Sequence, residues 1–84
     1  MLNRYVYIAP SPVNIPQGAN SLAITGLALT YFNPAPSKVL GQVKGDQSAA
    51  IYPIDITAPT TDGFTVTFNT TIPNGNFYFD FCVI

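Results

Sequence analysis

The chain has 84 residues, and only 8% of them are charged, against about 25% in a typical soluble domain. Its net charge of −1 and its three basic residues exclude the basic surface that binds nucleic-acid phosphates. One cysteine and no histidine exclude an internal disulfide and a zinc-type ligand set.

Period-two alternation between turn residues recurs along the chain, and no window keeps a helical apolar period, so every element is expected to be a strand. Extended segments are predicted at residues 3–8, 13–15, 21–25, 27–32, 37–44, 50–57, 64–69 and 77–83. Proline, glycine and polar residues separate them, as in the loop at 33–36 and the turn at 44–48.

This spacing predicts an all-β fold, a small antiparallel β-sandwich of about six to eight strands with immunoglobulin-like character. A small closed barrel is the alternative. Residues 1–84 are expected to form a single domain, in which residues 1–12 are an extended N-terminal arm or an edge strand.

Two strands carry residues with a positional meaning. Gly41 inside a strand indicates a bulge or a close approach of the backbone. Pro53 indicates an edge strand or a bulge, because proline cannot donate to the ladder. On the same strand, Ile54 and Ile56 are expected to face inward and Asp55 outward.

The last two predicted strands, 64–69 and 77–83, alternate apolar and polar residues most clearly. Phenylalanine and valine hold one face of each strand, and a tight turn is expected at Ile72–Gly75. The pattern predicts an antiparallel hairpin that supplies much of the core.

No nucleophile–base pair can be assembled, and the aspartates are typical of turns, so we expect a non-enzymatic protein without catalytic, cofactor or metal sites. The outward residues of the last strand and the N-terminal tyrosines are candidates for protein–protein contact. They are Tyr5, Tyr7, Tyr78, Asp80 and Cys82. Plain half-buried packing and stacking on sugar rings are the alternative roles of the tyrosines.

A domain this small has a thin stability margin, which favours a homo-oligomer, with a trimer preferred. The apolar stretch at the N-terminus is too short for a signal peptide, and no run of apolar residues is long enough for a transmembrane helix. The chain is therefore expected to be made in a cytoplasm, in agreement with the free Cys82.

Residues 13–84 resemble small β-sandwich modules of tailed-bacteriophage virions. The shared stretches are Ile15–Ser21 (IPxGxxS), Pro36–Val39 (PSxV) and Thr60–Val66 (TxDGFTV), followed by an aromatic last strand. Such modules occur in capsid decoration proteins, head fibres and tail proteins. The resemblance implies a virion protein that binds the major capsid protein or other virion proteins.

The segments Pro36–Val39 and Thr60–Val66 and the aromatic last strand are also similar to the H-type lectin domain. That domain is a six-stranded sandwich that forms trimers or hexamers and binds N-acetylgalactosamine-like sugars, so the predicted sandwich is either immunoglobulin-like or H-type-lectin-like. The expected function is thus a capsid decoration or other accessory role in the virion. The alternative is a carbohydrate-binding module of a tail fibre or an H-type-lectin-like protein, with a surface glycan as its ligand.

Overall fold

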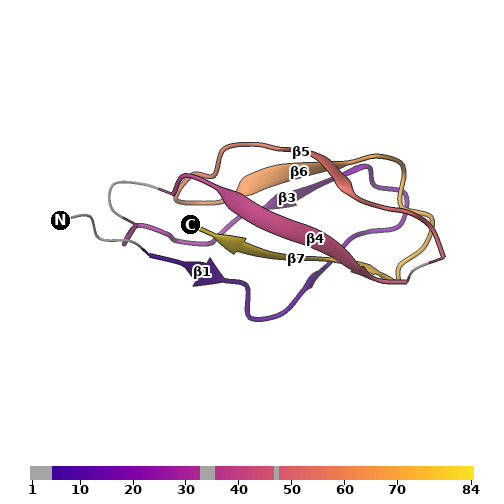
Figure 1. Ribbon diagram of the computed structural model, residues 1–84, viewed down its shortest axis with the longest axis horizontal. Coiled ribbons are helices and arrows are strands. Elements are labelled where there is room, and N and C mark those ends of the chain that lie inside the picture. Colours follow the sequence, from indigo (N-terminus) through magenta and orange to yellow (C-terminus); the bar gives the residue numbers. More distant parts are fainter. Residues whose placement is uncertain (1–4, 33–35, 47) are drawn as a thin grey trace.

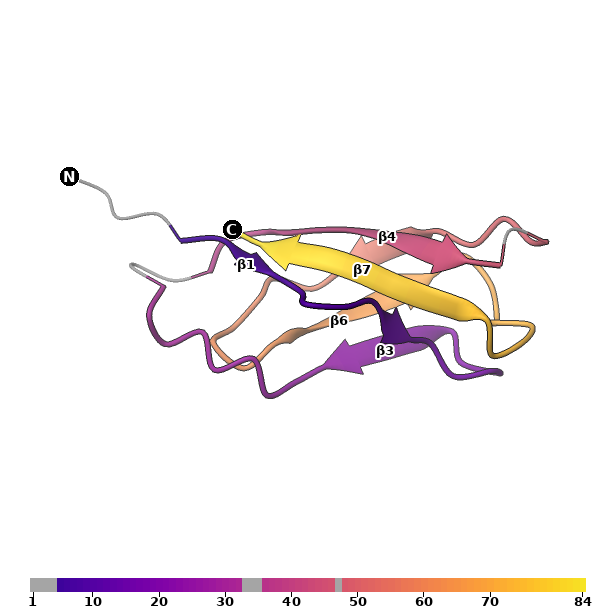
Figure 2. The same cartoon turned by 90° about the horizontal axis from the view of Figure 1, so that it is seen from below.

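The computed structural model describes residues 5–32, 36–46 and 48–84, which form seven β-strands and no helix. The strands are β1 (Tyr7–Ile8), β2 (Val13–Asn14), β3 (Ser21–Ile24), β4 (Val39–Gly45), β5 (Pro53–Ile56), β6 (Phe64–Phe68) and β7 (Phe77–Val83). Two antiparallel sheets lie face to face (Figure 1, Figure 2), so the predicted β-sandwich is confirmed and the barrel is wrong. Residues 3–4 of the first predicted strand and 33–35 of the predicted loop lie outside the described residues.

Sheet A is built around β7. Strand β4 pairs with β7 along its whole length, from Val39 opposite Val83 to Gly45 opposite Phe77. Strands β1 and β2 both pair with the other side of β7, one beside each half of it. Two prolines lie between β1 and β2, and because proline has no N–H to donate, the pairing is interrupted there. Residues 7–8 of the N-terminal segment therefore pair within their own chain.

Sheet B has the order β3–β6–β5, which places Pro53 on an edge strand, as the sequence predicts. The register shifts between Pro53 and Asp55, so a bulge is present as well. A bulge sets two residues opposite one and breaks the alternation of the strand. Ile54 is consequently 61% exposed, and the prediction that it faces inward is wrong, whereas Ile56 packs against the core.

The core forms where β6 faces β7 across the two layers. Phe64 of β6 lies edge-on to Phe81 of β7 at 5.1 Å between ring centroids, and Phe79 contacts Phe64 and Phe68 at 6.3 and 6.2 Å. The predicted apolar faces are correct, but the predicted hairpin is wrong, because β6 and β7 belong to different sheets. Facing each other, the two strands bury both of their aromatic faces against one another.

The segment that joins β6 to β7 is anchored by Ile72 rather than closed as a hairpin turn. The N–H of Ile72 donates to the carbonyl of Ala19, and its carbonyl accepts from the N–H of Gly18, both at 2.8 Å. The Ile72 side chain is buried. These contacts hold the chain at the end of the sandwich while it crosses from sheet B to sheet A.

The predicted strand at 27–32 is not formed. Ala28 has a φ of 53°, in the left-handed region that interrupts an extended strand. The backbone N–H groups of Leu27 and Leu29 donate to the carbonyls of Asp62 and Thr61 at 2.9 and 2.7 Å. Leu29 and Phe32 of this irregular segment each bury their side chain in the core. The apolar residues of the segment therefore resemble the pattern of a strand, although no strand forms.

Of the two predicted reasons for a glycine at position 41, a bulge or a close approach of the backbone, the structure shows the close approach. The β4–β7 register runs through it without a shift, so there is no bulge. A β-carbon at this position would meet the ring of Phe79, with its Cε1 and Cε2 atoms at 2.9 and 3.1 Å. The buried Phe79 ring thus occupies the space that a side chain at position 41 would need.

Candidate interaction surface

The face of sheet A that is turned away from sheet B, here called the outer face, carries exposed apolar side chains. Ile8 and Leu40 both lie opposite Cys82 in the strand register, one on each side of β7. These three residues, the outer row, cross three strands that are about 4.8 Å apart. Ile8 is 72% exposed and Leu40 51%, with Cys82 half-buried between them.

Two further apolar residues extend this region toward the C-terminal end of β7. Ile84 exchanges backbone hydrogen bonds with Lys38, at 3.0 Å and 2.9 Å, and its side chain is exposed. Continuing the β1–β7 register by one residue places the exposed Val6 beside Ile84. The apolar region thus covers the end of sheet A that also holds β1 (Figure 2).

The other half of the outer face is polar. Lys44 Nζ lies 3.6 Å from Asp80 Oδ2, and both side chains are open to solvent, so the pair contributes at most about 1 kcal/mol. Tyr78 is 38% exposed and lies opposite Lys44 and Asn14 in the register. A β-carbon at Gly45 would come within 3.0 Å of Tyr78 Cδ1, so the tyrosine ring lies against the backbone of β4.

The predicted interface residues fall into two groups. Tyr78, Asp80 and Cys82 share the outer face, since alternate residues of one strand point to the same side. Tyr7 instead packs against the core, with its ring centroid 6.2 Å from that of Phe81. Tyr5 lies edge-on to Tyr31 at 5.4 Å, at the end of the sandwich. The structure does not bring Tyr5 and Tyr7 to the surface that holds the other three.

Sequence reasoning missed Ile8, Leu40 and Ile84 as surface residues. Leu40 shares its parity with Gln42, and Ile84 shares its parity with Asp80, so for these two residues the alternation itself contained the signal. Ile8 has the opposite parity to the predicted Tyr5 and Tyr7, so the prediction for its strand chose the other face. The apolar character of Leu40 and Ile84 hid the signal, because isoleucine and leucine are usually assigned to a core. Only the pairing of β1 and β4 with opposite sides of β7 shows that they gather.

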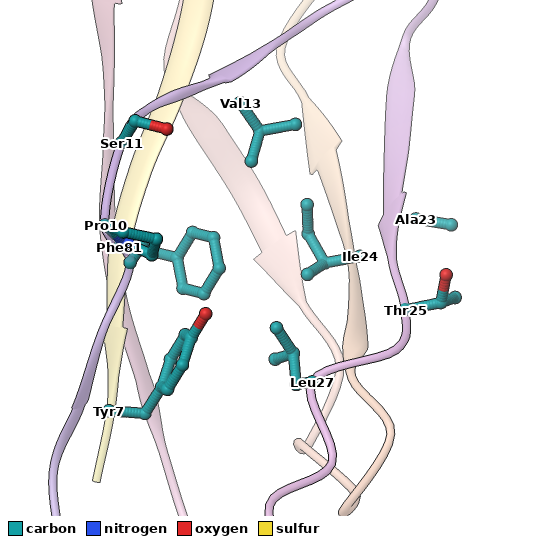
Figure 3. Close-up of a pocket in the computed structure, with 10 residues that line it drawn as sticks. Tyr7, Pro10, Ser11, Val13, Ala23, Ile24, Thr25, Leu27 and Phe81 are labelled. Carbon is teal, nitrogen blue, oxygen red and sulfur yellow. The ribbon is translucent and has the colours of Figure 1, made fainter.

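A pocket of about 360 Å³ opens between the two sheets where the β1–β2 segment faces β3. Figure 3 shows the rings of Tyr7 and Phe81 projecting from sheet A toward Ile24 and Leu27. Ser11 lies at its edge, and the Ala23 and Thr25 side chains point away from the Phe81 ring. The pocket is a gap between the layers, lined by apolar side chains together with polar groups such as the hydroxyls of Tyr7 and Ser11.

Two of the four acidic residues, Asp46 and Asp62, stabilise turns. Asp46 accepts hydrogen bonds from the N–H of Ser48 at 2.8 Å and from Asn74 Nδ2 at 3.0 Å. These bonds, the backbone one first, hold the pKa of Asp46 below its usual value. Asp62 accepts from the N–H of Gly26 at 3.0 Å. Among the described residues there is no cluster of three acidic, cysteine or histidine side chains that could hold a metal ion.

Within residues 5–32, 36–46 and 48–84, no helix is long and apolar enough to cross a membrane. No protein-family model, no curated protein and no solved structure matches the chain.

Proposed function

We propose that this protein is a non-enzymatic accessory component of a tailed-bacteriophage virion, and that it binds capsid or other virion proteins as an oligomer. A capsid decoration role fits it best. The observation that carries the proposal is the outer row, which exposes Ile8 and Leu40 on either side of Cys82. Monomeric soluble domains rarely expose contiguous apolar patches larger than about a few hundred Å², and patches of that size mark interaction sites.

The chemistry around the outer row favours a protein partner. Charged residues make up only 8% of the chain, so a partner would displace little tightly held water from charged groups. The Lys44–Asp80 pair lies in the polar half of the same face, so charged groups border the apolar region on one side, as they do at the rim of an interface. An open sheet face of this kind suits a large protein surface better than a small ligand, which needs a concave site.

Mass spectrometry of purified particles of the phage that encodes the chain is the first test, and we expect the protein to be present. Purified protein should then cosediment with particles that lack it. Ile8→Asp should abolish cosedimentation, because it places a charge in the outer row, yet it should leave the melting temperature nearly unchanged at a position 72% exposed. Absence from the particles, or full binding by the Ile8→Asp variant, would contradict the proposal.

The matched control is Thr70→Asp, which introduces the same charge at an exposed position in the loop after β6. It should cosediment like the unaltered protein. Tyr78→Asp separates the two halves of the outer face: reduced binding would extend the interface to the polar half, and normal binding would confine it to the outer row.

Carbohydrate binding is the second candidate, supported by the position of Tyr78. Its exposed ring lies against the β4 backbone and beside the polar side chains of Lys44 and Asp80. A tyrosine face with polar neighbours can stack on a sugar ring. Binding on a glycan array that disappears in Tyr78→Ala but persists in Ile8→Asp would favour this function over the virion role.

A further inference from the structure

The two sheets have four edges in the described part of the chain, and three of them are protected against pairing with another strand. The β1–β2 edge contains Pro10 and Pro12, and the β5 edge contains Pro53 and a bulge. The β3 edge is only four residues long. Prolines, bulges and short strands are the devices by which proteins prevent edge-to-edge association.

The β4 edge has none of these devices. It is seven residues long, its register with β7 is unbroken, and it contains no proline. A strand of this length measures about 23 Å at roughly 3.3 Å per residue. Among the described strands, none pairs with the side of β4 that faces away from β7. A regular edge of this kind is a template for a further strand.

The backbone groups that β4 presents can be assigned from its pairing with β7. Lys38 and Ile84 exchange two hydrogen bonds, and in an antiparallel ladder every second residue bonds to the same neighbour. Leu40 and Gln42 therefore bond to β7 in the same way. The N–H and C=O groups of Val39, Gly41 and Val43 point to the open side of β4.

We propose that β4 pairs with β4 of a second copy of this chain, antiparallel and centred on Gly41. Gly41 then lies opposite the partner's Gly41, and Val39 opposite the partner's Val43. The twofold axis repeats the Val39–Val43 pair, so three residue pairs face each other across the two strands. Each pair can exchange two bonds, so about six backbone hydrogen bonds link the copies. A twofold axis fits this edge because the same residues serve both copies. The twofold pair replaces the trimer favoured by the sequence.

A twofold axis at Gly41 pairs more of the open β4 edge than an axis at a neighbouring residue of β4 would. Moving the axis to Val39 would set Val43 against the partner's residue 35, where the chain contains prolines on both sides. Centring on Gly41 instead places two valines opposite each other twice, and β-branched cross-strand pairs stabilise a sheet. It also brings Leu40, 51% exposed, diagonally close to the partner's Leu40, within reach of a long side chain.

The side chains around this axis also favour a second copy. Ile54 of β5 and Tyr52, which directly precedes β5, are exposed, and β5 runs beside β4 at the same side of the sandwich (Figure 1). These two side chains would add apolar contacts along the strand pair. The contact remains at the small end of stable interfaces, about 1,200 Å² or less in total, so we expect a dissociation constant on the order of micromolar.

The register has one electrostatic signature. Lys38 would lie opposite the partner's Lys44, and like charges directly opposite each other weaken a strand pair. Asp80, 3.6 Å from Lys44 in the same chain, offsets part of this repulsion. Dimerisation should therefore strengthen when salt is added, and it should strengthen in a stepwise manner when Lys38 is replaced by a neutral and then an acidic residue.

Sedimentation equilibrium of the full chain over a range of concentrations tests the proposal. We expect a reversible monomer–dimer equilibrium. Lys38→Gln should tighten it, and Lys38→Glu should tighten it about tenfold and reverse its response to salt, since each dimer gains two opposite-charge pairs. Val43→Pro should abolish the dimer, because it removes an N–H from the open side of β4 and none from the β7 ladder.

The melting temperature of Val43→Pro, compared with that of Lys38→Gln, shows whether Val43→Pro loses the dimer while still folded or because it unfolds. The Lys38 series, which touches no core residue, carries the test if Val43→Pro unfolds. A protein that stays monomeric at millimolar concentration, a trimer, or a dimer insensitive to the Lys38 series would each overturn the proposal. None of these outcomes depends on a virion role, since the experiment uses the protein alone.

Discussion

Replacing Gly41 with alanine tests whether the core is as close-packed as the contacts at this residue indicate. The added β-carbon would meet the ring of Phe79, with Cε1 at 2.9 Å and Cε2 at 3.1 Å. The ring cannot retreat easily, because Phe64 and Phe68 lie on its other sides at 6.3 and 6.2 Å between centroids. Phe79 is fully buried, so any displacement is passed to the opposite sheet.

The magnitude follows from two opposing effects. Overpacking a core costs about 1–3 kcal/mol, whereas replacing a strand glycine restores roughly 0.5–1 kcal/mol by restricting the unfolded chain. We expect Gly41→Ala to lower the free energy of unfolding by about 1–2 kcal/mol, which for a domain of this size lowers the melting temperature by roughly 5–15 °C.

Urea unfolding followed by tyrosine fluorescence would measure this change, at a protein concentration low enough to keep the chain monomeric. Gly75→Ala is the matched control, because a β-carbon there meets nothing within 4 Å. In a Phe79→Leu background, which makes room beneath β4, the cost of Gly41→Ala should fall by at least half. An equal cost in both backgrounds, or a Gly41→Ala variant as stable as the unaltered protein, would refute the close-approach argument.

Three further changes have expected outcomes. Gly63→Ala should destabilise the fold more than Gly41→Ala in the same urea assay, because its β-carbon would meet the backbone carbonyl of Ile24, which cannot rotate away. Because the folded-state pKa of Asp46 is lowered, its contribution to stability is present above about pH 4 and is lost as the pH falls through the lower, folded-state value; melts of Asp46→Asn from pH 7 to pH 2 should lack this part of the acid loss. Cys82 should react with a maleimide in the folded protein at a rate independent of protein concentration, because the outer face stays open in the β4-paired dimer; protection on dimerisation would indicate association through that face.

Local alternation predicted the strands that matter most for the core. The faces of β6 and β7 follow directly from phenylalanine at every second position, and the edge position of β5 follows from the missing N–H of Pro53. Both are properties of single residues and their nearest neighbours. They do not depend on which strands become partners.

Strand partners could not be predicted in the same way. Placing β6 and β7 side by side or face to face satisfies the same alternation, and the choice depends on Ile72 and its bonds to the chain near Gly18. The outer row depends on β1 and β4 flanking β7, although Ile8, Cys82 and Leu40 are far apart in sequence. Tyr78, Asp80 and Cys82 share one strand, so their grouping was accessible from sequence.

The arrangement of sheet A also sets the order in which the protein can fold. Sheet B draws all its strands from residues 21–68, and its β5–β6 pair is a local contact. Every pairing in sheet A requires β7, so Tyr7 must find Val83 across nearly the whole described chain. Pairing over such separations is slow, typically in milliseconds to seconds. Until β7 docks, β4 has two open sides instead of one, which makes refolding yield sensitive to protein concentration.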